Sequence, residues 1–262
     1  MISIFIRKRL FQPDTVRYIT QLASGRPNFI HQKRIDELIS GLKQDNNWAL
    51  LDRLWIFAQP VQPLARVSLV NPTSTQITEV NAPTWTANQG YAGNAVNMYL
   101  NTNFNPNTQG VNYRAGNCSI GMYSRTNVLE AGNDMGFASA TIFTQLISRD
   151  AGGFRSRINN TVAQGIAAVA NADSTGLFSV VRTGAVNILL YRNAVLLATV
   201  AVAETSVPSF VIYIGSANVN DVATTFTTKQ HSFAYAGSGA IDQLKLFLRM
   251  ERYMDQLGTG VV

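Results

Sequence analysis

Residues 186–203 read VNILLYRNAVLLATVAVA, and this stretch decides between a membrane segment and the core of a folded domain. Arg192 and Asn193 interrupt the apolar run, and a charged residue in the middle of a bilayer would be costly. The pair fits the tip of a β-hairpin, with VNILLY entering the turn and VLLATV leaving it. Ala194 stands where an Asn-Gly turn has glycine, so we expect a longer loop or a β-bulge here.

The hairpin belongs to a series of predicted strands between residues 58 and 237. Short runs rich in Val, Ile, Phe and Tyr alternate there with clusters of Gly, Asn, Pro and Thr, roughly every ten residues. The runs include RVSLV (66–70), CSIGMYSR (118–125), FTQLISRD (143–150), LFSVVRT (177–183) and KQHSFAYAG (229–237). Such short strands without intervening helices predict an all-β antiparallel sandwich or barrel rather than a parallel α/β sheet.

Amphipathic helices are predicted on both sides of this region. Residues 14–23 and 31–57 have apolar side chains at helical spacing, interrupted by QDNN at 44–47. The second segment has two apolar groups: Ile35, Leu38, Ile39 and Leu42, then Leu50, Leu51, Leu54, Trp55 and Phe57. The expected domains are therefore a helical region at 1–57, a sandwich at 58–237 and a carboxy-terminal helix at 238–262.

The carboxy-terminal helix has a start, an apolar stripe and a stop in the sequence. Ser238 is the expected N-cap, and Ile241, Leu244, Leu248 and Met254 form the expected buried stripe, with Phe247 beside it. Gly258 is the expected stop, because glycine readily adopts the left-handed conformation that ends many helices. One face of this helix should pack on the sandwich or on the amino-terminal helices.

The charge pattern does not indicate nucleic-acid binding. Residues 1–53 contain nine Lys or Arg and five Asp or Glu, so most of the net charge of +6 lies there. The one basic cluster, Arg7-Lys8-Arg9, is too short for the basic stripe with interleaved aromatics that nucleic-acid binders show.

The start MISIFIRKRL lacks the order of a signal peptide, and no window holds the ~20 apolar residues of a spanning helix. We therefore expect a soluble protein made in a cytoplasm.

The residues that usually carry chemistry are sparse. Cys118 is the sole cysteine, which excludes a disulfide within the chain, and His31 and His231 are interpreted as structural. Asn- and Asp-rich loops at 171–174 and 218–221 fit turns, so no metal and no cofactor are expected.

Glycoside hydrolysis needs two carboxylates placed on either side of the scissile bond. The nearest approximation is EAGND, with Glu130 and Asp134, and its Gly-Asn pair indicates a loop. We therefore expect no catalytic residues and no enzyme activity.

Several segments together resemble a known family. They are GLKQDNNWALLDRLWIFA (41–58), GYAGNAVNMYLNTNFNP (90–106), GLFSVVRTGAVNILLYRNAVLLAT (176–199), FVIYIGSANVN (210–220) and FAYAGSGAIDQLKLFLRMERYMDQLG (233–258). In this order they resemble concanavalin A-like (LamG-type) jelly-roll proteins of the kind encoded among bacteriophage and prophage virion structural genes. The resemblance covers residues 35–258 and implies two curved antiparallel sheets that bind glycans or proteins rather than catalyse a reaction.

A sugar site needs an aromatic surface for the apolar ring face and polar donors for the hydroxyls. APTWTANQGYAGN (82–94) supplies Trp85, Tyr91 and Asn94 in a turn-rich segment, and Arg149 ends a predicted strand. These four residues are the candidate glycan contacts. The alternative is that Trp85 and Tyr91 are buried in the sandwich.

The amino-terminal arm suggests a partner protein. Ile2, Ile4 and Ile6 alternate before the basic triplet Arg7, Lys8 and Arg9, as in a segment that adds to a partner as a strand. We therefore expect a bacteriophage virion structural protein, located on the particle as a capsid, tail or baseplate component. Its expected partners are other virion proteins, further copies of itself and a host-surface glycan. The alternatives are a free lectin or adhesin and, behind it, a polysaccharide-cleaving glycoside hydrolase.

Overall fold

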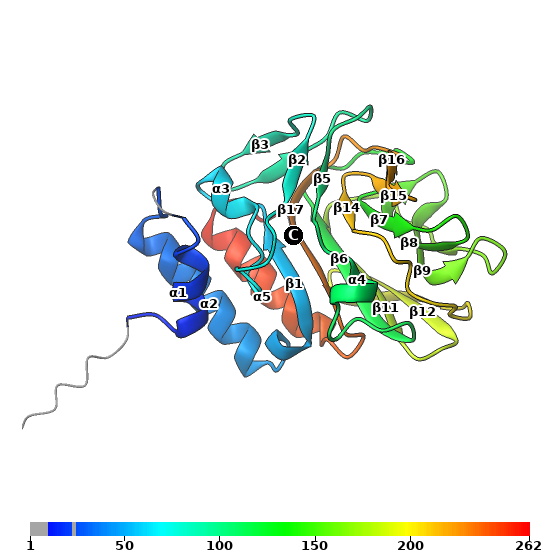
Figure 1. The fold of residues 1–262 in the computed structure, drawn as a ribbon, viewed down its shortest axis with the longest axis horizontal. Coiled ribbons are helices and arrows are strands. Elements are labelled where there is room, and N and C mark those ends of the chain that lie inside the picture. The colour runs from blue at the N-terminus through cyan, green and yellow to red at the C-terminus, as the bar shows by residue number, and fades with distance from the viewer. Residues whose placement is uncertain (1–9, 23–24) are drawn as a thin grey trace, which may run out of the picture.

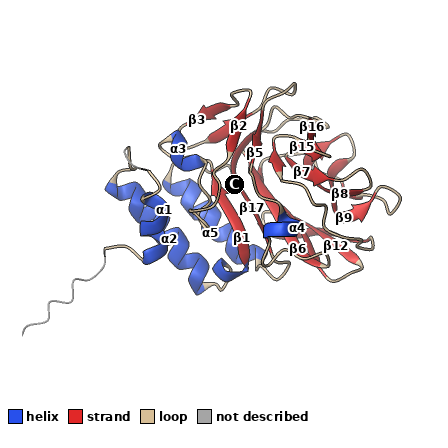
Figure 2. Cartoon of the chain, in the orientation of Figure 1, coloured by secondary structure: helices blue, strands red, loops and turns tan. Residues whose placement is uncertain are grey.

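The computed structural model describes residues 10–22 and 25–262, which form two stacked β-sheets with a layer of helices against one of them (Figure 1, Figure 2). This confirms the predicted fold class, an antiparallel β-sandwich with flanking helices. The expected partner-binding residues of the arm, Ile2, Ile4, Ile6, Arg7, Lys8 and Arg9, lie outside the described residues. No helix of the described ranges is both long and apolar enough to cross a membrane.

The first sheet carries the hairpin at one edge and is antiparallel throughout. In spatial order its strands are β13 (Val195–Ala201), β12 (Asn187–Arg192), β11 (Gly176–Thr183), β6 (Asn117–Ser124), β17 (Gln230–Gly237), β4 (Gly90–Ala92) and β3 (Thr84–Thr86). A further strand, β1 (Leu51–Ile56), pairs with the second half of β17.

The second sheet is antiparallel except where β15 pairs with β7. In spatial order its strands are β10 (Ala167–Val169), β9 (Gly153–Thr161), β8 (Ile142–Asp150), β7 (Met135–Ala138), β14 (Tyr213–Ile214), β5 (Tyr99–Asn101) and β2 (Thr78–Val80). β15 (Ala217–Val219) joins at β7 and pairs with β16 (Val222–Thr224).

A layer of helices lies against the first sheet (Figure 1). It consists of α1 (Pro13–Ile19), α2 (Phe29–Gln44), the 3₁₀ turn η1 (Trp48–Leu50), α3 (Gln62–Ala65) and α5 (Gln243–Gln256). The short helix α4 (Pro106–Gln109) is separate from this layer. The predicted stripe Ile35, Leu38, Ile39 and Leu42 is buried on α2, which confirms that helix.

Alternation along the strands produces two separate cores. On β17, Ala234 and Ala236 face the space between the sheets, whereas Phe233 and Tyr235 pack under the helices. Because side chains of a strand point alternately to opposite faces, the first sheet is buried on both sides.

The hairpin of residues 186–203 confirms the strand prediction and corrects the turn. Asn193 and Ala194 form a two-residue turn with φ of 49° and 65°, the positive pair that type I′ turns require, so no longer loop exists. The expected bulge is present, because the β12–β13 register shifts after Leu190. Asn193 holds the turn in place: its backbone N–H donates to Leu177 O and its Oδ1 accepts from Leu177 N, both at 2.8 Å.

The predicted helix over residues 48–57 is wrong, since Leu51–Ile56 is the strand β1. Leu54 and Ile56 pack under the helices while Trp55 faces the other sheet, so the strand is apolar on both sides. A continuously apolar strand places residues at i, i+3 and i+4 by chance, and spacing alone cannot distinguish it from a helix. The predicted strand at 66–70 is also wrong: it contributes a single bridge, from Ser68 to Trp55.

The carboxy-terminal helix is confirmed, but its predicted start is wrong and its predicted buried stripe is right in part. Asp242, not Ser238, is the N-cap and accepts from Lys245 N. Ile241 and Met254 are buried as predicted, whereas Leu244 and Leu248 are more than half exposed, at 57% and 54%, and Leu246 and Met250 are buried in their place. The stop at Gly258 is confirmed by its φ of 69° just beyond the helix.

Candidate functional site

Of the four residues predicted to bind a glycan, the structure brings Trp85 and Tyr91 together, whereas Asn94 and Arg149 bond elsewhere. Trp85 on β3 lies opposite Tyr91 on β4, and no hydrogen bond joins Asn94 or Arg149 to either of them. Asn94 accepts from the backbone N–H groups of residues 96–98 and so shapes a turn. Arg149 lies on β8 of the other sheet and donates to Asn127 Oδ1 at 2.6 Å.

The two aromatic residues of that set are used in packing. The Trp85 indole donates to Phe57 O at 3.2 Å, and Tyr91 is 2% exposed with its hydroxyl donating to Glu79 Oε1 at 2.5 Å. Burial raises the pKa of the Tyr91 hydroxyl above its ordinary range, and the Glu79 hydrogen bond adds to this effect. A glycan role for these residues stays a prediction.

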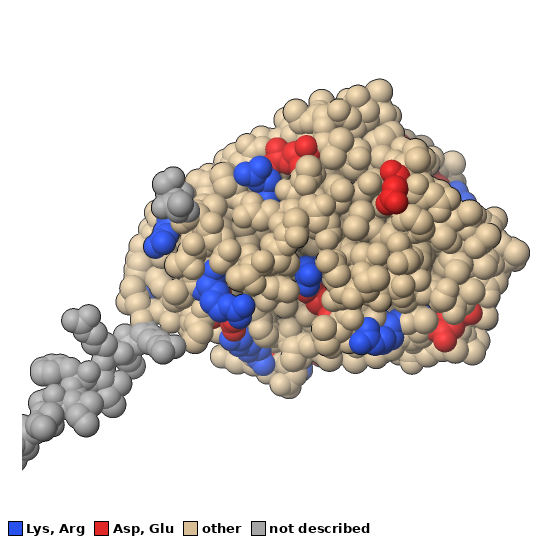
Figure 3. All heavy atoms as spheres, viewed as in Figure 1, with Lys and Arg blue, Asp and Glu red and all other residues tan. Residues whose placement is uncertain are grey.

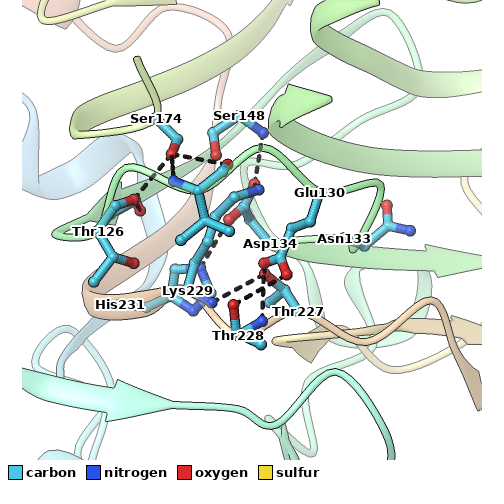
Figure 4. Close-up of polar contacts among 12 residues, drawn as sticks. Thr126, Glu130, Asn133, Asp134, Ser148, Ser174, Thr227, Thr228, Lys229 and His231 are labelled. Carbon is cyan, nitrogen blue, oxygen red and sulfur yellow. Dashed lines mark hydrogen bonds and ion pairs between the residues drawn. The ribbon is translucent and has the colours of Figure 1, made fainter. Parts of the chain in front are cut away.

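A buried ionic cluster joins the two sheets (Figure 4). Asp134, just before β7, accepts from His231 Nε2 at 2.9 Å and lies 3.4 Å from Lys229 Nζ, both on the β17 side. Its Oδ2 also accepts from Ser148 N at 2.5 Å. Burial by itself would raise the pKa of Asp134, but Lys229 and His231 hold that pKa well below its usual range.

This cluster cannot serve as a ligand site, although it contains Ser, His and Asp. The exposed fractions of Asp134, Lys229 and His231 are 0%, 0% and 2%. Ser148 contributes its backbone N–H, and its hydroxyl has no hydrogen-bond partner among the described residues. The arrangement therefore connects the sheets and offers no nucleophile to a substrate.

Glu130, the other carboxylate of the predicted EAGND loop, is also used in structure (Figure 4). Its Oε1 accepts from Thr228 N at 2.8 Å and from the Thr227 hydroxyl, and its Oε2 accepts from the Thr228 hydroxyl at 3.0 Å. These bonds fix a loop to the strand region before β17.

An open groove of about 400 Å³ lies where the helices meet the start of β1, and we call it the β1 groove. The residues that matter for its chemistry are Trp48, Asp52, Arg53, Asn71, Gln109 and Asn112. They come from η1, β1, the loop after residue 69, and the α4 region. In the view of Figure 3, charged side chains are few and scattered, and Lys and Arg gather toward the helices.

A β-bulge arranges the floor of the β1 groove. The β1–β17 register shifts between Leu51 and Arg53, which frees Asp52 from the regular ladder. The Asp52 carboxylate accepts from the backbone N–H groups of Val111, Asn112 and Tyr113, at 2.8 to 3.2 Å. Three successive amides thus surround this carboxylate, as in an anion-binding nest.

Several polar atoms in the groove have no partner within the described chain. Gln109 uses Oε1 to accept from Asn105 N, and Asn112 uses Nδ2 to donate to Ala49 O. Gln109 Nε2, Asn112 Oδ1 and the Trp48 indole N–H have no hydrogen-bond partner among the described residues, so they remain available to a ligand. Trp48 is half-buried, with Lys43 Nζ 5.5 Å from its ring centroid.

Arg53 is the most buried cation of the groove. It is 8% exposed, its guanidinium carbon lies 4.3 Å from the Phe104 ring centroid, and Nη1 donates to Asp52 O at 2.7 Å. Burial lowers the pKa of Arg53, and the nearby Asp52 charge opposes that shift. Sequence reasoning missed Trp48 and Arg53 because it placed both in a helix. The available signal was a charged pair, Asp52-Arg53, inside an otherwise apolar run.

A second groove, of about 190 Å³, separates α2 from α5. Two of the three arginines that line it, Arg249 and Arg252, already have carboxylate partners, Asp45 at 2.7 Å and Glu37 at 3.7 Å. This groove is also smaller than the β1 groove, which is therefore the better candidate site.

No protein-family model matches the sequence, and no curated protein sequence matches it. Among solved structures, the chain is similar to the botulinum neurotoxin serotype D binding domain, at 11% identity and a TM-score of 0.54, over 82% of this chain and 53% of that one. It is also similar to the receptor-binding domain of a botulinum neurotoxin C/D mosaic (11% identity, TM-score 0.53, 80% and 52%). A third is Trypanosoma rangeli sialidase in complex with sialic acid (11% identity, TM-score 0.52, 88% and 40%).

At this identity the likeness shows the fold alone. It agrees with the β-sandwich expected from the sequence, whereas the bacteriophage part of that resemblance stays a prediction. This chain spans 53% of the serotype D toxin chain and 40% of the sialidase chain, so the activities of those proteins do not transfer to it.

Proposed function

We propose that this protein is a carbohydrate-binding β-sandwich module and that the β1 groove is its sugar site. One observation carries the proposal. The groove places the half-buried Trp48 indole beside side-chain donors and acceptors of Arg53, Gln109 and Asn112 that have no partner among the described residues.

The chemistry of the groove suits a sugar. A pyranose has an apolar ring face, which packs on an aromatic side chain, and hydroxyls, which need planar polar groups at fixed positions. The volume of about 400 Å³ falls within the range of roughly 300–1,000 Å³ that small-molecule sites occupy. The lining contains one carboxylate, Asp52, and three backbone amides occupy it. Since glycoside hydrolysis needs two carboxylates, the groove favours binding over cleavage.

A matched pair of tryptophan variants tests the site. Trp48→Ala should weaken binding of the sugar identified on a glycan array by at least about 10-fold, as loss of an aromatic anchor does. Trp85→Ala is the control, because Trp85 is a second partly buried tryptophan and the one favoured by sequence. Equal affinity of wild type and Trp48→Ala, in folded protein, contradicts the groove. Loss only in Trp85→Ala restores the sequence-based site.

The particle context is a separate proposal, based on the sequence resemblance. It holds that the module is a virion structural protein, attached to other virion proteins through its amino-terminal region. One surface feature supports it: apolar side chains cluster exposed near the start of α1 and α2. They are Leu10 at 72%, Val16 at 43%, Phe29 at 49% and Ile30 at 62% exposure. Exposed apolar side chains that cluster in this way often mark a site of interaction with another protein.

Incorporation into particles tests this second proposal. Phe29→Ser combined with Ile30→Ser should leave sugar binding unchanged and reduce the amount of protein that sediments with assembled particles. Undiminished incorporation contradicts attachment through this surface. A stable oligomer of the purified chain that the same double variant dissociates would instead assign the surface to self-association.

A further inference from the structure

Arg53 holds a buried positive charge without a carboxylate partner in the described chain. Its single hydrogen bond there runs from Nη1 to a backbone carbonyl, and no acid lies within ion-pair distance. Its Nε and Nη2 have no hydrogen-bond partner among the described residues and are not fully buried, and Arg53 is one of the residues that line the β1 groove. One face of the guanidinium is covered by the Phe104 ring.

Other buried cations of this protein are provided with acceptors. Lys229 faces the Asp134 carboxylate. Arg182, 0% exposed, donates to the carbonyl oxygens of residues 158, 187, 202 and 203. Because removing a charge from water is costly without compensation, Arg53 stands out as a buried cation with a single acceptor and no carboxylate among the described residues.

Asp52 does not supply that acceptor. Its carboxylate is surrounded by three amides of residues 111–113, and Arg53 contacts only its backbone oxygen. Two further cations stand near the groove: Arg17 lines it and Lys43 lies over the Trp48 ring. Both pair with the Asp14 carboxylate, so Arg53 is the cation of the groove that lacks a carboxylate partner among the described residues.

We propose that the ligand of the β1 groove is an acidic sugar whose carboxylate binds the guanidinium of Arg53 while its ring packs on Trp48. A planar carboxylate matches the fork of guanidinium N–H groups, and such charge-assisted pairs are the stronger hydrogen bonds. This inference rests on the proposed sugar-binding function and adds the charge of the ligand.

Pairs of sugars that differ only in charge test the proposal on the full chain. Suitable probes are 3′-sialyllactose against lactose and trigalacturonate against its methyl ester, each measured by calorimetry. Wild type should bind at least one acid about 10-fold or more tightly than its neutral twin. Arg53→Gln and Arg53→Lys should each weaken binding of that acid by about 10- to 100-fold and leave the neutral twin almost unchanged.

The variants separate failure of this inference from failure of the proposed function. Arg53→Lys keeps the charge and the aliphatic stem, so it remains informative where Arg53→Gln does not fold. Arg157→Gln is the matched control, because Arg157 also lies over a phenylalanine ring, that of Phe143, on the second sheet. Equal binding of acid and neutral twin, still lost in Trp48→Ala, overturns the acidic ligand and leaves the sugar site standing. Acid preference that survives Arg53→Gln also overturns it, whereas failure of the wild type to bind any sugar on the glycan array overturns the proposed function.

Discussion

His31 makes the attachment of the helical layer to the sandwich sensitive to pH. It lies in the first turn of α2, is 3% exposed, and its Nε2 is 2.8 Å from Gln59 Oε1 and 3.2 Å from the Tyr253 hydroxyl of α5. Burial lowers the pKa of His31 to about 4, the Gln59 hydrogen bond partly opposes this, and Arg34 adds to it. The positive end of the helix dipole also disfavours a second proton here.

The sign and size of the effect follow from linkage. In the unfolded chain His31 takes up its proton near pH 6.5, whereas in the folded protein it does so near pH 4. Its contribution to stability is therefore complete above pH 6.5 and is lost as the pH falls toward 4. A difference of about 2.5 pKa units corresponds to about 3 kcal/mol at the acid end of this window.

Urea unfolding between pH 7 and pH 4 measures this contribution. His31→Gln retains a polar group of similar reach without titrating, so other ionisable groups affect both proteins alike. Wild type should lose about 3 kcal/mol more than His31→Gln over this range. Equal losses in the two proteins, or an NMR titration that places the His31 pKa near 6.5, would refute the reasoning.

Two further predictions concern the hairpin and the cluster between the sheets. Ala194→Gly should stabilise the fold by about 0.5–1 kcal/mol in thermal unfolding, because a left-handed alanine is strained, whereas Ala201→Gly, at the end of β13, should destabilise it by a similar amount. A loss of stability in Ala194→Gly would show that the turn is not strained. Lys229→Met should cost about 3–5 kcal/mol, because it leaves Asp134 buried without its ammonium partner, and adding Asp134→Leu should recover much of that loss. Additive losses in the double variant would disprove the coupling.

The strands were predictable where apolar and polar residues alternate along the sequence, or where turn-forming residues mark the end of an apolar run. The hairpin is the clearest case, because Arg192 and Asn193 mark its tip within an apolar stretch. β1 was not predictable in this way, because it is buried on both faces and its apolar residues also satisfy helical spacing.

The buried face of α5 shows a different limit. Gln243 and Glu251 are buried at 8% exposure each, although their side chains are polar, because tyrosines of the first sheet bond to them. Tyr235 donates to Gln243 Oε1 at 3.0 Å and Tyr123 to Glu251 Oε2 at 2.8 Å. A pattern of apolar residues cannot reveal a face whose polar members have partners on distant strands.

The candidate site was least accessible to sequence reasoning, because its residues are brought together only by the junction of the two layers. The helices cover the first sheet, and the sheets cover each other, but the start of β1 lies where neither cover is complete. The bulge at Asp52 ends regular pairing there, and the 111–113 backbone closes on the released carboxylate. The same geometry that gives the Asp52 carboxylate three amide donors leaves Arg53 in the groove without an ion-pair partner among the described residues, and the proposed ligand contact rests on this difference between the two neighbours.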